Sequence, residues 1–411
     1  MDNHKRAGAA NRRQLLSRVL FVAAIAGAGF GTYYYYTGTM APTAFAQAEC
    51  AAQPARYIIR PIGADRFEVE LTLGRNAAQL DIVSRQTGNR RMRTEDFIEN
   101  VRYRRADGTE VAIDHAGEGS WQMPTMSESN PVIVYEISAT HDQHPWRNGK
   151  EEIAYNFDGS AFMTGWTVLL TDYQQYGCPS EVTFDLPEDW TAIAPWDSIG
   201  PNQYRTLNTQ DLHKNGFALG PSMPLFTAQA GASKLTIVYE QEVKEVAEQT
   251  SRDADAVFRF YQDTYGGPAG SDYTIFMVSD NQSDGGAFER SFAQRFALPG
   301  NEAEEMVWRH GFAHEVGHLW NGITIAPERA DTNEWFKEGF TDYLTLKALL
   351  AIDALKPHEL ENKIETIVRR GSTIIGKVTV LRVRGRAIRT CHQDCLAEPR
   401  VERCWRREFL Q

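Results

Sequence analysis

The residues with the clearest chemical potential are His314, Glu315 and His318, which form an H-E-x-x-H pattern. Residues four apart on an α-helix lie on the same face, so the two histidines can bind a single Zn²⁺. Glu315, next to the first histidine, can then reach the attacking water as a general base. A solvent-facing helix that carries these residues by chance is the alternative. The spacing favours zinc-dependent hydrolysis.

This pattern needs a helix to position it, and the flanking sequence predicts one. Asn301 followed by Glu304 has the form of an N-cap with its capping-box partner, so a helix is expected to start at Glu302. No proline follows before Pro327. The predicted helix therefore extends through both histidines.

A hydrolytic zinc site needs a third protein ligand and one open position. Glu334 and Glu338 lie four residues apart in the next predicted helix, and either carboxylate could face the metal on geometry alone. His310, one turn before His314 on the same face, is expected to support the site or the core rather than to bind the metal.

Segments 314–322 and 335–343 together resemble the gluzincin zinc peptidases, and most of all the PDZ-type glycyl aminopeptidase family. In that family the glutamate of W-x-x-E-G-x-T-x-Y binds zinc, which implies Glu338 rather than Glu334. The resemblance implies an aminopeptidase that acts on peptides or proteins and favours small N-terminal residues. A thermolysin-like endopeptidase, and a peptide-binding protein that keeps the peptidase fold without turnover, remain alternatives.

The segment before the zinc helix contains Gly285, Gly286 and Glu289. Aminopeptidases of this kind place a substrate-binding edge strand here, which can pair with an extended peptide. The resemblance implies that Glu289 receives the α-amino group of the substrate, although it is displaced by one residue from the family pattern. A simple turn at the two glycines, with Glu289 as a surface charge, is an equal alternative.

The N-terminal residues 1–48 are predicted to be a signal peptide or an N-terminal anchor. Basic residues that include an Arg12-Arg13 pair precede a short apolar run at 19–31, and two A-x-A cleavage sites follow. We expect export to the periplasm or the extracellular space, with membrane association if the segment stays uncleaved. The net charge of −11 argues against nucleic acid as a partner.

The rest of the chain predicts an α+β protein with two folded domains. Residues 49–240 are rich in alternating apolar and polar residues, with strands expected at 66–73, 131–137 and 166–170, and indicate a β-sandwich-like domain. Residues 241–375 predict a thermolysin-like catalytic domain that begins with a helix at 243–265 and a strand at 273–278. Residues 376–411 form a basic, cysteine-containing tail without a regular pattern.

The C-terminal part departs from the resemblance. Relatives continue with a sizeable helical domain, so the chain is expected to be C-terminally short, and no tyrosine follows Tyr343 to serve as the usual oxyanion donor. In an exported protein the five cysteines leave at least one unpaired, and Cys50 with Cys178 is one candidate bridge. His141 and His144 are expected in an exposed loop, and a second metal site at Cys391 and Cys395 is disfavoured because no partner pair accompanies it.

Overall fold

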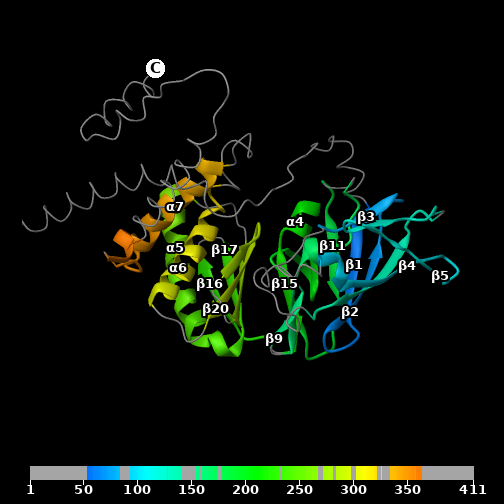
Figure 1. Cartoon of the computed structure of the whole chain (residues 1–411), viewed down its shortest axis with the longest axis horizontal. Helices are drawn as coiled ribbons and strands as arrows, with labels where there is room; N and C mark the ends of the chain where they lie inside the picture. Colours follow the sequence, from blue (N-terminus) through cyan, green and yellow to red (C-terminus); the bar gives the residue numbers. More distant parts are fainter. Residues whose placement is uncertain are drawn as a thin grey trace, which may run out of the picture.

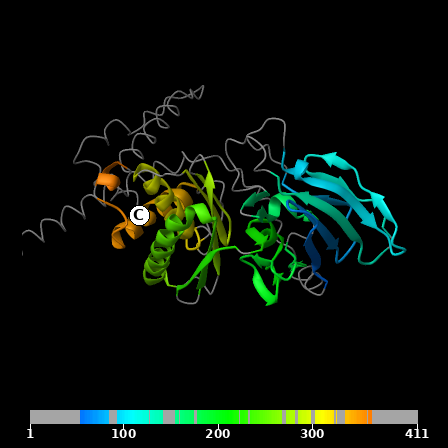
Figure 2. The same ribbon diagram turned by 90° about the horizontal axis from the view of Figure 1, so that it is seen from below.

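The computed structural model describes residues 53–362 except for 84–92, 127, 141–153, 158, 174–176, 222, 231–232, 267–271, 281–283, 298–301, 322–324, 326–333 and 357. The predicted leader at 1–48, the histidines of 141–144 and the tail at 376–411 lie outside the described residues. The described residues form two lobes side by side (Figures 1 and 2). The fold is mixed α+β, as the sequence predicted.

The first lobe is built from three sheets. The largest has the strand order β13-β14-β11-β1-β2-β8-β4-β5, the second β12-β15-β10-β9, and the third β3-β7-β6. The strands are β1 (Ala55–Pro61), β2 (Arg66–Thr72), β3 (Gln79–Asp81), β4 (Ile98–Arg104), β5 (Glu110–Ala112), β6 (His115–Gly117), β7 (Ser120–Gln122), β8 (Val132–Ser138), β9 (Tyr155–Phe157), β10 (Ser160–Thr164), β11 (Ser180–Phe184), β12 (Thr191–Ile193), β13 (Asp197–Gly200), β14 (Gln203–Arg205) and β15 (Gly216–Gly220).

The two larger sheets of this lobe share one hydrophobic core. In β2, Phe67, Val69 and Leu71 are buried while the residues between them are partly exposed, which is the alternation that predicted the strand. Met163 of β10 and Phe217 of β15 belong to the same cluster. The first lobe is therefore sandwich-like in its packing. Its helical pieces are short: η1 (Thr94–Phe97), α3 (Gly165–Val168) and α4 (Thr209–His213).

The strand predicted at 166–170 is wrong, because α3 occupies most of this segment. A Cβ at Gly165 would lie 2.0 Å from the carbonyl oxygen of Leu212, so glycine alone allows the chain to approach α4 here. The carbonyl groups of Val168 and Leu170 accept hydrogen bonds from the buried hydroxyls of Tyr135 and Tyr57. Tertiary contacts thus satisfy the backbone that a sheet would otherwise have paired.

The second lobe is a five-stranded sheet covered on one face by helices. Its order is β16-β17-β18-β20-β19, with parallel pairing among β17, β18 and β20 and antiparallel pairing at both edges. The helices α5, α6 and α7 lie together on one side of this sheet (Figure 1). The elements are β16 (Leu225–Ala230), β17 (Ser233–Tyr239), η5 (Gln241–Val243), α5 (Lys244–Tyr265), β18 (Tyr273–Asp280), β19 (Asp284–Ala287), β20 (Ser291–Ala297), α6 (Glu302–Gly317) and α7 (Glu334–Ala351).

The sequence placed the boundary between the lobes at residue 240, and the sheet begins earlier. β16 and β17 precede that residue, yet β17 pairs in parallel with β18 over five residue pairs. Their alternating pattern is equally suited to either sheet, so pattern alone assigned them to the β-rich domain. Helix α5 and strand β18 follow the predicted ranges closely.

The central strand β18 of the five-stranded sheet is buried on both faces. Ile275 and Met277 of β18 point toward the helices, whereas Phe276 and Val278 point toward the first lobe and pack in one cluster with residues such as Phe162. The rings of Phe162 and Phe276 are 4.9 Å apart. A shared apolar layer therefore joins the two lobes.

Two further features concern a disulfide and the hydropathy of the helices. Cys178 is disulfide-bonded, and its partner lies outside the described residues. Among the described helices, none is long and apolar enough to cross a membrane.

Candidate metal centre

Two helices bring the candidate metal ligands together. His314 and Glu315 lie in the last turn of α6, and His318 directly follows the helix, with its amide N–H still donating to the carbonyl of His314. Helix α7 packs against α6 and carries Glu338. The helix predicted from Glu302 and the one expected around Glu338 are both present.

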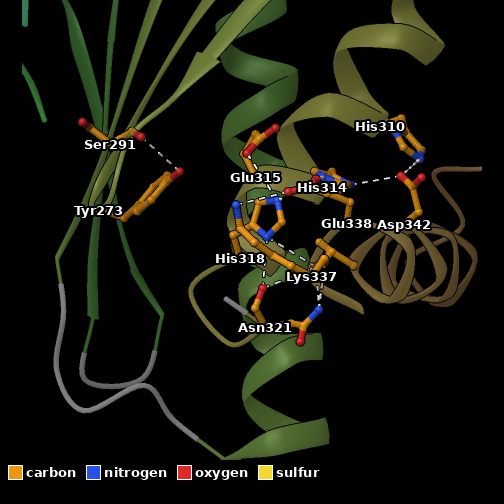
Figure 3. Close-up of polar contacts among 12 residues, drawn as sticks. Tyr273, Ser291, His310, His314, Glu315, His318, Asn321, Lys337, Glu338 and Asp342 are labelled. Atoms are coloured by element: carbon orange, nitrogen blue, oxygen red, sulfur yellow. Dashed lines mark hydrogen bonds and ion pairs between the residues drawn. The ribbon is translucent and has the colours of Figure 1, made fainter. Parts of the chain in front are cut away.

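The side chains of His314, His318 and Glu338 converge on one point (Figure 3). One candidate ligand atom from each residue lies within 4.8 Å of the other two. Oε2 of Glu338 is 3.1 Å from Nε2 of His314 and 3.4 Å from Nε2 of His318. Two imidazole nitrogens and one carboxylate oxygen are the donor set of a catalytic zinc site that keeps one position open.

The second nitrogen of each imidazole ring has a partner of its own. Nδ1 of His314 is 3.0 Å from Oδ1 of Asp342, and Nδ1 of His318 is 3.0 Å from the carbonyl oxygen of Asn321. The Asn321 amide in turn donates to Thr341 Oγ1. When the rings are neutral, these contacts favour the proton on Nδ1 and leave Nε2 able to bind a metal, as the outer hydrogen-bond partners of metal-binding histidines do.

The electrostatics of the cluster favour a positive charge between the rings. Burial alone would lower the pKa of His314, but its hydrogen bonds with Asp342 and Glu338 raise the pKa well above the ordinary value. Burial alone would raise the pKa of Glu338, but the two histidines hold it far below its ordinary range. A site that stabilises cationic histidine beside a carboxylate in this way also suits a divalent cation, so the donor set fits zinc.

Glu315 lies beside this cluster without belonging to it. Its Oε2 is 3.8 Å from Nε2 of His318, and its side chain is partly exposed. Figure 3 shows the Glu315 carboxylate close to the imidazole rings of His314 and His318. A carboxylate at this position is close enough to exchange a proton with a water molecule held near the histidines.

The other candidates from the sequence fall outside the cluster. Nε2 of His310 is 3.4 Å from Oδ1 of Asp342, so His310 contacts the carboxylate behind His314, in the supporting position expected of it. The backbone of Glu334 begins α7, and its side chain lies outside the described residues. Lys337 places its Nζ 3.1 Å from Oε1 of Glu338, the oxygen that does not face the histidines.

The glycine inside the H-E-x-x-H segment has a packing role. A Cβ at Gly317 would lie 2.8 Å from the hydroxyl oxygen of Tyr261 in α5 and 3.0 Å from Cγ2 of Thr341 in α7. The three helices therefore approach one another closely at Gly317, next to the candidate metal ligands. The buried Tyr261 hydroxyl also donates to the carbonyl of Ala313.

The edge strand predicted before α6 is present as β19, at one edge of the five-stranded sheet. It contains Gly285 and Gly286, which pair with Gln294 and Ala293 of β20, and α6 packs against it. A Cβ at Gly285 would lie 2.7 Å from Cζ of Phe292, so this glycine also has a structural reason. The outer side of β19 pairs with no other described strand.

Glu289 lies in the turn that joins β19 to β20, at the boundary between the lobes. Its carboxylate accepts a hydrogen bond from the side chain of Gln210 in α4, and its amide donates to the carbonyl of Lys214 over 2.8 Å. Burial raises the pKa of Glu289, which the nearby Lys214 ammonium and Gln210 partly offset. Glu289 is thus half-buried and held in place, rather than a free surface charge.

Sequence reasoning assigned no role to Asp342, Asn321 or Thr341. All three lie in or next to the motifs that suggested the site. Asp342 follows Glu338 by one helical turn. The same spacing argument that paired the histidines could therefore have placed it on the face of α7 toward the candidate metal ligands.

Comparison with known proteins supports the architecture. The fold is similar to the crystal structure of an aminopeptidase N family protein from Idiomarina loihiensis, with a TM-score of 0.57 and 18% sequence identity. The match covers 74% of this chain and 56% of that one, so the chain spans little more than half of its length. No protein-family model and no curated protein sequence matches the chain. The likeness is therefore one of fold.

Proposed function

We propose that this chain is a zinc-dependent peptidase, with His314, His318 and Glu338 as the metal ligands and Glu315 as the general base. The observation that carries this proposal is the convergence of two Nε2 atoms and one carboxylate oxygen within 4.8 Å, with a second glutamate beside them. Bound zinc would polarise a peptide carbonyl and lower the pKa of water in the site.

The chain's own residues would carry the proton transfers. Glu315 would accept a proton from the attacking water as its oxygen forms a bond with the carbonyl carbon. It would then pass this proton to the nitrogen as the C–N bond breaks, so that an acid and a free amine leave. Asp342 and Asn321 would keep both imidazoles oriented throughout.

The position of β19 at the edge of the five-stranded sheet, as far as the chain is described, supports an extended peptide as the substrate. A peptide can continue the ladder of β20 and β19 through backbone hydrogen bonds, with its side chains directed alternately to the two faces. Glu289, one turn beyond this strand, would receive a free α-amino group, which makes the enzyme an aminopeptidase. Preference for small N-terminal residues remains part of the proposal.

Export is the proposed location, and the disulfide at Cys178 supports it. Disulfides persist mainly in oxidising compartments such as the periplasm and the extracellular space. The enzyme would therefore meet peptides and proteins outside the cytosol.

The test is a digestion of a mixed peptide library by the wild-type protein and the Glu315→Gln variant, with zinc analysis of both. We expect one zinc per chain in both proteins and hydrolysis only by the wild type. Zinc binding without hydrolysis of any peptide would contradict the enzymatic function and indicate a peptide-binding protein. Cleavage of N-acetylated peptides at internal bonds would contradict the aminopeptidase function and indicate an endopeptidase.

A further inference from the structure

The turn between β19 and β20 is attached to the other lobe by a buried ion pair. Arg290 directs Nε to Oδ1 of Asp211 over 3.0 Å and Nη2 to Oδ2 over 2.7 Å. Their side chains are 10% and 2% exposed, so solvent screens this pair only weakly. Two parallel bonds between a guanidinium and a carboxylate fix direction as well as distance.

Asp211 is itself held firmly on α4. Its Oδ2 accepts from the amide of Leu207 and its amide donates to the N-cap Asn208. Its carbonyl accepts hydrogen bonds from Trp196 and Asn215. The ion pair therefore connects the turn to a rigid part of the first lobe.

Backbone contacts on either side of Arg290 strengthen the same attachment. The amide of Arg290 donates to Oδ1 of Asn215 over 2.8 Å, and Oγ of Ser291 accepts from the amide of Gly216 over 2.9 Å. The neighbouring Glu289 contacts Gln210 and Lys214, as described above. Glu289 and Arg290 of the turn, together with Ser291 at the start of β20, thus contact one short segment, residues 210–216.

We propose that α4 of the first lobe positions the turn between β19 and β20 for substrate binding. The ion pair of Arg290 with Asp211 acts as a clamp between the lobes, and Gln210 orients the Glu289 carboxylate. The inference rests on the proposed function for the identity of the ligand, a peptide with a free α-amino group. Arg290, Asp211 and Gln210 are positioning residues that act through Glu289 and β19.

The test compares Arg290→Lys and Gln210→Ala with the wild type. Lysine keeps the charge but loses the paired bonds, so we expect KM for a free-amine peptide to rise about tenfold while kcat and zinc content change little. Gln210→Ala leaves the ion pair intact and should reduce the preference for the free-amine peptide over its N-acetylated twin. Asp197→Asn is the matched control, because Asp197 also contacts Arg290 but its side chain is 61% exposed.

Two readouts separate this proposal from the proposed function. In the Glu315→Gln background, calorimetry gives peptide affinity and amide exchange gives the protection of residues 284–291, and neither needs turnover. We expect Arg290→Lys to weaken both and Asp197→Asn to leave both unchanged. Equal affinity and protection in all three proteins, or a lower melting temperature alone, would overturn the clamp. Absence of hydrolysis by the wild type would overturn the proposed function instead.

Discussion

Asp342 lies 3.0 Å from Nδ1 of His314, one helical turn beyond Glu338 on α7. This contact fixes the ring that is proposed to bind zinc, and loss of such an outer partner typically weakens metal binding by about 10- to 100-fold. We therefore expect Asp342→Asn to lower zinc affinity by that factor, measured by competition with a chelator. Glu361→Gln, an exposed change, serves as the control and should leave the affinity unaltered.

The choice of the third ligand is open to a direct comparison of Glu338→Gln with Glu334→Gln. Only Glu338 is grouped with the histidines among the described side chains, so its loss should remove most of the bound zinc and all hydrolysis. Glu334→Gln should retain a full complement of zinc. Zinc loss from the Glu334 variant, with retention by the other, would reverse the assignment.

Replacement of two glycines of α6 by alanine should change the free energy of unfolding in opposite directions. Gly317→Ala adds a Cβ against Tyr261 and Thr341, and such overpacking costs about 1–3 kcal/mol of unfolding free energy. Gly311→Ala meets no atom within 4 Å, so the better helix propensity of alanine should stabilise the protein by about 0.5–1 kcal/mol. Urea unfolding measures both. A destabilised Gly311 variant would contradict the packing described here.

Acid should weaken the first lobe through His213. Burial lowers the pKa of His213 to about 4, and its Nε2 is 2.7 Å from Oγ1 of Thr171. In the unfolded chain it takes up a proton near its ordinary pKa, so its contribution to stability is complete above that value and declines as the pH falls toward 4. Linkage gives a loss of about 2 kcal/mol at pH 5.

The measurement for His213 is urea unfolding at about pH 7.5 and pH 5 in the wild type and in His213→Gln. The variant should lose less stability on acidification than the wild type, since glutamine does not titrate. His358→Gln, at an exposed histidine, is the control and should follow the wild type. Identical pH dependence in all three proteins would exclude this role for His213.

Local patterns predicted much of the second lobe. The spacing of His314 and His318 and the N-cap at Asn301 predicted α6, and the apolar period of residues 243–265 predicted α5. The choice of Glu338 depended on the resemblance, because Glu334 satisfies the same spacing. In the structure, Oε2 of Glu338 lies within 3.4 Å of Nε2 of both imidazoles, whereas the Glu334 side chain lies outside the described residues.

What pattern could not predict are the contacts between segments far apart in the chain. Strand β17 pairs with β18 although α5 lies between them in the chain, and Arg290 pairs with Asp211. No local pattern in the sequence indicates that these residues are in contact. Residues 166–170 have strand-like composition, yet contacts with Tyr57, Tyr135 and α4 determine their conformation. Such long-range contacts override local preference.

The apolar layer between the lobes has a consequence for anyone who dissects this protein. Phe276, Val278 and Ala293 are sealed from water by side chains of the first lobe, such as Phe162 and Ala218. A fragment starting at residue 225 would keep every proposed zinc ligand yet expose this apolar surface to solvent. We expect that fragment to aggregate during expression, so the second lobe should not fold as an independent domain.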